Sequence, residues 1–387
     1  MINYIFWIGL ACYLGLFMLR ILFSYFYFKA EKEKKGKWKE HLYTVLQPIV
    51  SGDPRLADDL SANLQNTSEL SFLWLLDKGD VEAERICGEI LQNPQYRSRV
   101  RMLYYDTVPQ SYNPKIYKIE QALQEVQTPY IIVLDDDSVV DMEKMAELSR
   151  YENEEREVII TGIPHNYGMD NFWSKLVSAF VNGNALITYF TMAFLGKNES
   201  INGMFYIVST EIARQYELFS AIKYYLCDDL AVAEHLSAQG VQIIQSRISV
   251  NVRNTVQSGK QYFLLMKRWL LFSSIYVKRH WSMELFLMIL LSGTLPFVLL
   301  VLAMLSGIQN TLALLLSLLL KAIILYGYRQ GIIGKKQSLS AVLYEVLSDL
   351  LLCPLFLATI LGRPIILWRN KVIYVKDGKI EYKRGTL

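Results

Sequence analysis

The chain has 387 residues, a formal net charge of +3 and 52% hydrophobic residues, with a mean hydropathy of +0.20. This length suits one large domain or two ordinary ones, and the hydrophobic content is high for a wholly soluble protein. Four widely separated cysteines and four scattered histidines argue against a disulfide framework, a zinc site or a histidine metal cluster. Because the net charge is small and no nucleic-acid motif is present, no nucleic-acid partner is expected.

The first segment, residues 1–28, is almost uninterrupted apolar and aromatic sequence, which predicts an N-terminal transmembrane anchor. Basic residues follow this run instead of preceding it, and that order argues against a cleavable signal peptide. Residues 29–41 form a basic juxtamembrane linker, since Lys29 to Lys39 contain six lysines against two glutamates. This asymmetry predicts that the linker, and the domain after it, lie in the cytoplasm beside an anionic bilayer.

Residues 42–281 are less hydrophobic, and strand-like runs alternate there with amphipathic helical patterns. Strands are expected at 43–50, 70–76, 100–105, 130–134 and 158–163, and helices at 54–64, 81–91, 114–126 and 142–150. A β-α-β-α order predicts an α/β, Rossmann-like domain with a mostly parallel, doubly wound sheet. Ligands of such sheets bind outside the carboxyl ends of the strands.

Residues 282–387 are predicted to form membrane helices followed by a basic cytoplasmic tail. The apolar spans 285–305 and 312–326 are separated by a short neutral link. An antiparallel pair of membrane helices is therefore expected.

The next apolar stretch, residues 341–361, contains Glu345, Asp349 and a proline. Charges within a membrane span are costly, and a further full crossing would place the basic tail outside. These observations favour an interfacial or re-entrant helix pair at this stretch.

The sequence VLDDDS, Val133 to Ser138, places three carboxylates directly after a predicted buried strand. Carboxylates this close repel one another unless a cation lies among them, and their hard oxygens suit Mg²⁺ or Mn²⁺. Side chains alternate along an extended backbone, so Asp135 and Asp137 are expected to point the same way. Asp77 ends another predicted strand, and this repeated position favours a metal site over a solvated acidic loop.

A second acidic signal is YLCDDLAVAEHLSAQG, in which Asp228 and Asp229 begin a predicted helix. Capping that helix needs only one of them, so the other is available as a general base. Arg268 and Trp269 lie in LLMKRW, before the membrane helices. They suit either an interfacial belt or a pocket for a diphosphate and an acceptor.

The order of these residues resembles the D, DxD, ED and (Q/R)xxRW series of family 2-type glycosyltransferases with a GT-A fold. The resemblance is closest to the ceramide glucosyltransferase branch, family 21, and extends to the stretches QPIVSGDPRLADDL, NPKI, GIP, NGM and WRN. It covers most of the chain. Two positions depart from the family pattern: ED is DD here, and Leu265 replaces the Gln or Arg that opens the last motif.

The resemblance implies an inverting, non-processive membrane glycosyltransferase that moves a sugar, most simply glucose, from a UDP-sugar to a lipid hydroxyl. A ceramide-like acceptor is favoured, and hopanoid, diacylglycerol or another lipid remains open. On the donor side, Asp77 would contact the uridine base, and Lys115 and Asp135 the nucleotide. Asp137, with Asp135, would bind an Mg²⁺ or Mn²⁺ ion.

On the acceptor side, the resemblance implies that Asp229, with Asp228 beside it, deprotonates the incoming hydroxyl. Arg268 and Trp269 would line the diphosphate and acceptor side. The expected partners are thus a UDP-sugar, a membrane lipid and the bilayer, and no pattern indicates an oligomeric state. A processive polysaccharide synthase and a non-catalytic membrane scaffold are the alternatives.

Overall fold

The computed structural model describes residues 1–30, 38–106, 108–109, 111–150, 157–335, 337–368, 371–376 and 379–381. The chain divides into two compact units, each assembled from separate segments. Unit 1 comprises Met1–Glu31, His165–Lys197 and Asn254–Val372, and unit 2 comprises Lys32–Pro164, Asn198–Arg253 and Ile373–Leu387. Most of the predicted basic linker and parts of the predicted basic tail, including the end of WRN, lie outside the described residues.

Unit 2 is built on an eight-stranded sheet with the order β3-β2-β1-β4-β7-β6-β8-β5. Its strands are β1 (Tyr43–Pro48), β2 (Ser71–Asp77), β3 (Val100–Tyr105), β4 (Tyr130–Leu134), β5 (Ser138–Val140), β6 (Val158–Asn166), β7 (Phe205–Ser209) and β8 (Gln242–Val252). The first four are parallel, as the β-α-β-α pattern predicts. The other half is not, because β7 runs antiparallel to β4 and β6, and β5 antiparallel to β8. The expectation of a mostly parallel sheet is therefore wrong for this half, and the sheet is mixed.

Helices cover both faces of this sheet. They are α2 (Leu56–Gln65), α3 (Val81–Ile90), α4 (Pro94–Arg97), α5 (Pro114–Ala122), α7 (Thr210–Gln215), α8 (Leu218–Ile222) and α9 (Asp228–Ala238). Short 3₁₀ segments occupy Glu40–Leu42, Leu123–Glu125 and Met142–Arg150, the last in place of the predicted α-helix.

Alternating side chains divide the interior of unit 2 into two layers. Val45 belongs to one core, with residues of α2 and α3, whereas Leu46 belongs to the other, with residues of α5, α8 and α9. The six residues of β1 are all buried, so the strand reads as a continuous run without polar alternation. The parallel half is thus a three-layer α/β structure whose strand ends present the polar residues discussed below.

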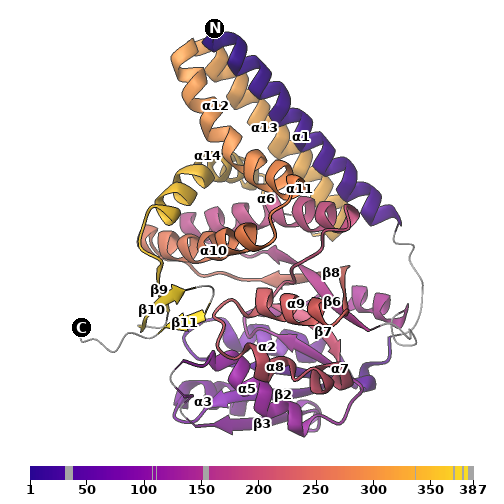
Figure 1. Ribbon diagram of the computed structural model, residues 1–387. Coiled ribbons are helices and arrows are strands. Elements are labelled where there is room, and N and C mark those ends of the chain that lie inside the picture. The colour runs from indigo at the N-terminus through magenta and orange to yellow at the C-terminus, as the bar shows by residue number, and fades with distance from the viewer. Residues whose placement is uncertain are drawn as a thin grey trace. The chain divides into compact units, whose positions relative to one another are not determined.

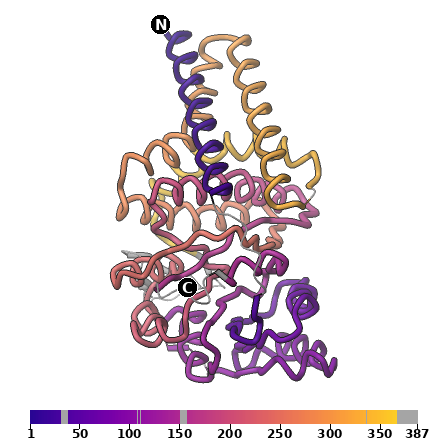
Figure 2. The backbone as a smooth tube through the Cα atoms, turned by 90° about the vertical axis from the view of Figure 1, so that its right-hand side faces the viewer, coloured from indigo at the N-terminus to yellow at the C-terminus, as the bar shows by residue number. Residues whose placement is uncertain are grey.

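Unit 1 is helical and hydrophobic. Its helices are α1 (Ile2–Ala30), α6 (Phe172–Phe194), α10 (Gly259–Arg279), α11 (Met283–Leu285), a π-helical turn (Phe286–Leu291), α12 (Ser292–Ser306), α13 (Ile308–Ile333) and α14 (Ala341–Ile360). Figures 1 and 2 show α1, α12 and α13 running side by side, with α6 and α10 lying across them. A small sheet of β9 (Ile365–Trp368), β10 (Lys371–Lys376) and β11 (Lys379–Glu381) follows α14.

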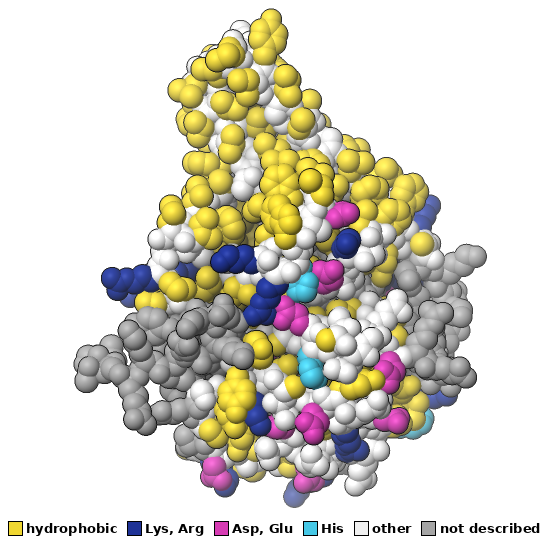
Figure 3. Space-filling model, viewed as in Figure 1, with side chains coloured by type: hydrophobic (Ala, Val, Ile, Leu, Met, Phe, Trp, Pro, Cys, Tyr) yellow, Lys and Arg dark blue, Asp and Glu magenta, His cyan; other side chains and the backbone are white. Residues whose placement is uncertain are grey.

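Five helices of the described residues are long and apolar enough to cross a membrane: Ile2–Ala30, Phe172–Phe194, Met283–Ser306, Ile308–Ile333 and Ala341–Ile360. Large hydrophobic side chains such as Trp7, Met304 and Leu316 are exposed on them, and Figure 3 shows the hydrophobic surface over α1 and α12. Such a surface is suited to lipid. Helix α6 was not expected from the sequence, and its mean hydropathy of 1.2 is the lowest of the five.

The stretch after α13 forms one continuous helix, α14, that passes through Pro354. The expected helix pair is therefore wrong. The acidic residues that suggested it are paired with bases of α13: Arg329 Nη2 lies 2.6 Å from Glu345 Oε1, and Lys321 Nζ lies 2.6 Å from Asp349 Oδ2. These ion pairs offset the cost of charge in an apolar helix pair.

The Arg329–Glu345 pair provides a test of how unit 1 is held together. Both side chains are at most 3% exposed, so Glu345→Gln should leave a buried cation without its counter-charge and destabilise the protein by about 3–5 kcal/mol. Thermal unfolding of the detergent-purified protein measures this loss. Glu82→Gln is the control, since its pair with Arg85 is exposed to solvent and should contribute little to stability. Equal melting temperatures for the two variants would contradict the role assigned to the buried pair.

Candidate active site

The candidate site lies at the carboxyl edge of the parallel strands of unit 2. Asp77 is the last residue of β2 and Asp135 directly follows β4, with β1 between these two strands. Gln47 of β1 connects the two sides: its Nε2 donates to the carbonyl of Asp135 at 3.2 Å, and its Oε1 accepts from Trp74 Nε1 at 3.1 Å. This is the edge at which sheets of this kind bind ligands.

The three consecutive aspartates form a turn and do not continue the strand. The Ser138 N–H donates to the carbonyl of Asp135 at 3.3 Å, so the argument from side-chain alternation does not apply there. Asp136 has a different partner from its neighbours: its Oδ2 accepts from the backbone N–H of Val50 at 2.8 Å. Asp137 Oδ1 accepts from Ser138 Oγ at 3.2 Å. Burial, and then the charges of Asp135 and Asp136, raise the pKa of Asp137 well above its ordinary value.

The Asp137 turn is also held from α2 and β8. Asn63 Nδ2 donates to the carbonyl of Ser138 at 2.8 Å, and the backbone N–H of Arg253 donates to the carbonyl of Asp137 at 3.5 Å. Arg253 Nη2 lies 3.2 Å from Asp59 Oδ1, and burial raises the pKa of Asp59 to about 6. Neither Asp59 nor Arg253 was expected at the site, since no local sequence pattern indicates a pairing between residues so far apart in the chain.

Lys115 brings the separate acidic motifs together. Its Nζ lies 2.7 Å from Asp135 Oδ1 and 3.2 Å from Asp228 Oδ2, and it donates to the carbonyl of Gly203 at 2.7 Å. Burial opposes the charge of this ammonium, but Asp135 and Asp228 raise the pKa of Lys115 well above its ordinary value. The cation therefore persists at neutral pH and balances part of the negative charge at the sheet edge.

The position of Lys115 follows from the start of α5. Asn113 is the N-cap residue, with Oδ1 accepting from the Lys115 N–H at 3.0 Å, and Pro114 occupies the first helical position. Asn113 Nδ2 also donates to the carbonyl of Tyr225 at 3.1 Å. The stretch NPKI thereby connects α5 to the segment that precedes Asp228.

Asp228 and Asp229 occupy the first turn of α9, as predicted, but neither is its N-cap residue, which is Cys227. Asp229 Oδ1 accepts from the Leu230 N–H at 2.8 Å and from Cys227 Sγ at 2.9 Å. Burial, and then the neighbouring charge of Asp228, raise the pKa of Asp229. A helix cap thus does not account for these two carboxylates, and Asp229 has the environment of a group that exchanges a proton.

Asp77 has a partner that the sequence analysis missed. Lys118 Nζ lies 3.2 Å from Asp77 Oδ1, and the Lys118 side chain is only 2% exposed. Lys118 follows Lys115 by three residues on α5, so the two lysines share a side of this helix. That spacing was visible in the sequence, but no motif marked it.

Arg268 and Trp269 belong to the other unit. They lie on α10, where the ring of Trp269 stacks on Phe180 with centroids 6.0 Å apart and planes 20° from parallel. Leu265, the residue that departs from the family pattern, packs in the same hydrophobic cluster as Trp269. Aromatic packing within unit 1 therefore accounts for the position of Trp269.

The oxygen ligands at the sheet edge fit a small divalent cation that also binds substrate. No group of three or more histidine, cysteine, aspartate or glutamate side chains is arranged as a metal site among the described residues. Mg²⁺ is commonly held by one or two carboxylates together with substrate phosphates. Asp137, close to the charges of Asp135 and Asp136, and Asp135 itself could supply two such carboxylates.

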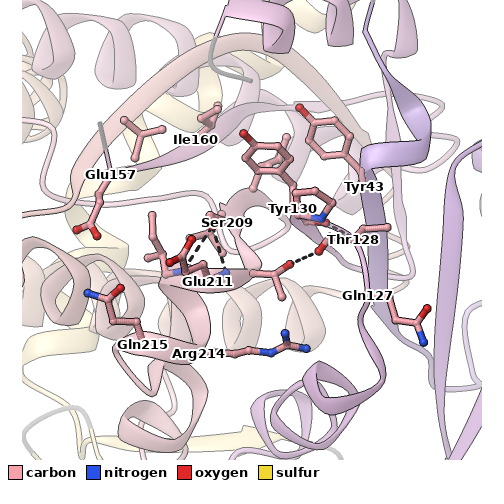
Figure 4. A pocket seen from close by; sticks show the side chains of 16 residues that line it. Tyr43, Gln127, Thr128, Tyr130, Glu157, Ile160, Ser209, Glu211, Arg214 and Gln215 are labelled. Carbon is pink, nitrogen blue, oxygen red and sulfur yellow. Dashed lines mark hydrogen bonds between the residues drawn. The ribbon is translucent and has the colours of Figure 1, made fainter. Parts of the chain in front are cut away.

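A separate cavity of about 820 Å³ opens at the opposite edge of the sheet (Figure 4). Tyr43 and Tyr130, the first residues of β1 and β4, lie in its wall with rings stacked 5.0 Å apart. Arg214 also lines it, and its Nη2 donates to the carbonyls of Leu123 and Val126. Because this cavity adjoins the amino ends of the parallel strands, it is distinct from the acidic site.

The sequence matches the family described as Glycosyl transferase family 21 over residues 10–381, so the chain belongs to this family. It matches none of the curated proteins with which it was compared. The fold is similar to that of the mannosyltransferase PcManGT from Pyrobaculum calidifontis in complex with GDP-Man and Mn²⁺, with a TM-score of 0.54 and 12% identity. That match covers 92% of this chain and 99% of the other.

A weaker similarity, with a TM-score of 0.37 and 10% identity, is to S. aureus TarS 1-349 in complex with UDP-GlcNAc, covering 89% and 97% of the two chains. The family and the fold together identify a glycosyltransferase with a GT-A catalytic unit. Its apolar helices make it a membrane protein. The resemblance to a GT-A family 21 enzyme is thus confirmed.

Gly203 provides a test of the packing beside Asp229. A Cβ atom at Gly203 would lie 3.0 Å from the Cβ of Asp229, closer than side chains normally approach. Gly203→Ala should therefore displace the Asp229 carboxylate and lower turnover by roughly 100-fold, with little change in nucleotide affinity. Turnover and nucleotide titration measure the two effects. Gly88→Ala on α3, where a Cβ meets nothing within 4 Å, is the matched control and should retain activity.

Proposed function

We propose that this membrane glycosyltransferase is inverting and non-processive, and that it transfers a sugar, glucose by preference, from a UDP-sugar to the hydroxyl of a ceramide-like lipid. The observation that carries the proposal is the convergence on Lys115 of the residues Asp135, Gly203 and Asp228, which come from three separate motifs. Such convergence is expected of a reaction site and has no purpose in a membrane scaffold.

The donor would bind at the carboxyl edge of β2, β1 and β4. Asp77 would accept a hydrogen bond from the uracil ring, and Asp135 with Lys115 would hold the remainder of the nucleotide. An Mg²⁺ or Mn²⁺ ion bound by Asp137 and Asp135 would stabilise the negative charge that develops on the departing diphosphate. These roles are supported by the family and by the placement of the side chains at the strand ends.

Asp229 is proposed as the general base. Asp228 is held by Lys115, whereas Asp229 has a pKa raised by burial and by Asp228, which increases its affinity for the proton of an acceptor hydroxyl. In the proposed reaction the hydroxyl oxygen of the acceptor forms a bond to the anomeric carbon, and the hydroxyl proton passes to Asp229. The bond between the anomeric carbon and the β-phosphate oxygen breaks, and UDP leaves. A single in-line displacement of this kind inverts the anomeric configuration.

The acceptor would reach the site from the bilayer. Unit 1 presents an apolar surface suited to lipid, and Arg268 and Trp269 of this unit are proposed to line the diphosphate and acceptor side. The excess of lysines in residues 29–41 supports a cytoplasmic location for the catalytic unit, where nucleotide sugars are synthesised. The intervals 1–28 and 282–387 are proposed as the anchor and the C-terminal membrane region, and 42–281 as the catalytic region, within which His165–Lys197 and residues 254–281 belong to unit 1.

The test is transfer from UDP-glucose, UDP-galactose and UDP-N-acetylglucosamine to ceramide, diacylglycerol and extracted lipids, with and without divalent cation. We expect one sugar per lipid, metal dependence, and near-complete loss of transfer in Asp137→Asn. Titration of Mn²⁺ in the presence of UDP should show weaker binding to this variant, because one anionic ligand is lost. A polymeric product would instead favour a processive synthase, and undiminished transfer by Asp137→Asn would contradict the metal assignment.

Substitutions that leave stability unchanged distinguish the roles of the two aspartates of α9. We expect Asp229→Asn to bind UDP normally and to lower turnover by about 10²–10⁴-fold, as the loss of a general base does. Asp228→Asn should reduce the rate less, because Asp228 holds Lys115 and does not take the proton. Melting temperatures provide the stability control, and rates of transfer to lipid give the comparison.

The pH profile adds a second criterion for the base. Because the pKa of Asp229 is raised, the wild-type rate should decline on the acid side at a higher pH than an ordinary carboxylate would produce. The residual rate of Asp229→Asn should lack this decline. A larger loss of turnover in Asp228→Asn than in Asp229→Asn would show that Asp229 is not the general base.

A further inference from the structure

Lys118 is a buried charged residue to which no motif of the chain assigns a role. It is buried in α5, as are Ile116, Ile119 and Ala122, which pack in the core cluster between this helix and the sheet. A lysine is seldom fully buried unless its ammonium is paired. The 3.2 Å contact with Asp77 Oδ1 provides such a partner, and this partner is the residue proposed to contact the nucleobase.

The turn after β2 is fixed around this ion pair. Asp80 caps α3 by accepting from the Ala83 N–H at 3.1 Å, and its other oxygen accepts from the Ser51 N–H at 2.9 Å. Gly79 has a φ of +92°, which permits the tight return from Asp77 to Asp80. Burial opposes ionisation of Asp80, but the hydrogen bonds from Ser51 and Ala83 and the charge of Lys118 lower its pKa. Lys118 thus lies close to both carboxylates of this turn, Asp77 and Asp80.

The two sides of the Asp77 carboxylate differ in environment. One oxygen contacts the buried ammonium of Lys118, while the Asp77 side chain as a whole is 34% exposed. A charge-assisted hydrogen bond stabilises the carboxylate and also restricts its rotation, so that it has a preferred orientation. The outward part of Asp77 is therefore held in place as a hydrogen-bond acceptor at the edge of the site.

We propose that Lys118 is a positioning residue that, by holding Asp77 Oδ1, orients this carboxylate to accept a single ring N–H and so selects uracil among nucleobases. The proposal rests on the UDP-sugar function given above. Uracil presents one ring N–H between two carbonyls. Cytosine presents an acceptor nitrogen at that position and would be repelled, and guanine presents two adjacent donors that match a carboxylate with both oxygens available.

Binding of UDP, CDP and GDP to the purified full-length protein tests this proposal by isothermal titration. Lys118→Met preserves the length and apolar stem of the side chain but removes the ammonium. We expect it to weaken UDP binding by about tenfold, the size of one charge-assisted hydrogen bond, and to reduce the preference for UDP over GDP. Lys78→Met is the matched control: Lys78 is adjacent to Asp77 in sequence but 54% exposed and paired with Asp106, so its loss should leave the preference unchanged.

A double-mutant cycle shows whether Lys118 acts through Asp77. In an Asp77→Asn background, Lys118→Met should have no further effect on UDP affinity, because the oriented carboxylate is already absent. Lys118→Gln is a second variant, used if Lys118→Met does not fold. Its side chain is neutral but can still donate to Asp77, so it should retain only part of the preference for UDP.

Three results would overturn the proposal, and they can be distinguished from one another. If wild-type protein binds UDP but Lys118→Met or Lys118→Gln retains its full affinity and preference, Lys118 has no such role and the UDP-sugar function stands. Additive losses for Lys118→Met and Asp77→Asn would likewise show that Lys118 does not act through Asp77. If wild-type protein prefers GDP or CDP, or binds no nucleotide, the proposed UDP-sugar function fails together with this inference.

Discussion

The charge balance around Lys115 is the constraint on which the catalytic unit depends. Carboxylates from the end of β4 and the start of α9 approach one point, and two negative groups so placed repel each other unless a cation lies between them. Lys115 provides that cation and also donates to the carbonyl of Gly203. For Asp137, by contrast, desolvation and then the charges of Asp135 and Asp136 raise the pKa well above its ordinary value. Lys115 therefore balances the charge on the side nearest α9, and Asp137 lies where a metal and a diphosphate are proposed to bind.

Sequence periodicity was sufficient for the parallel half of the sheet and insufficient for the rest. The runs that became β1, β2 and β4 are buried on both faces, and β3 at the edge of the sheet is only partly buried. All four alternate with amphipathic helices, so their order predicted the topology. β5 has only three residues, and β8 carries Gln245, Ser246 and Asn251 within a buried strand. Buried polar residues disguise such a strand, because their partners lie on other strands and helices. Asn251 Nδ2, for example, donates to the carbonyl of Val139 in β5.

The site and the membrane helices were predictable to different extents for a related reason. Aspartates at strand ends can be read from local sequence, which is why Asp77, Asp135 and the start of α9 were located correctly at the edges of their elements. Lys118, Asp59 and Arg253 become functional candidates only through contacts with residues distant in sequence. The same limit applied to α14: Glu345 and Asp349 indicated an interfacial segment until Arg329 and Lys321 of α13 were seen to pair with them. A charge has no fixed cost in an apolar helix, because the cost depends on its partner.

The placement of two lysines on α5 suggests why this helix is short and firmly capped. Asn113 fixes its first turn and ties it to the segment before α9, so Lys115 and Lys118, one helical turn apart, are delivered to Asp135 and Asp77 respectively. Any shift of α5 along its axis would disturb both ion pairs together. A nucleotide bound at this edge would meet both ion pairs. Its base would lie near Asp77 and Lys118, and its diphosphate near Asp135 and Lys115. Helix α5 would thereby hold the residues proposed to bind both ends of the donor. Through the ion pair of Lys115 with Asp228, the same helix also contacts the neighbour of Asp229, the proposed base.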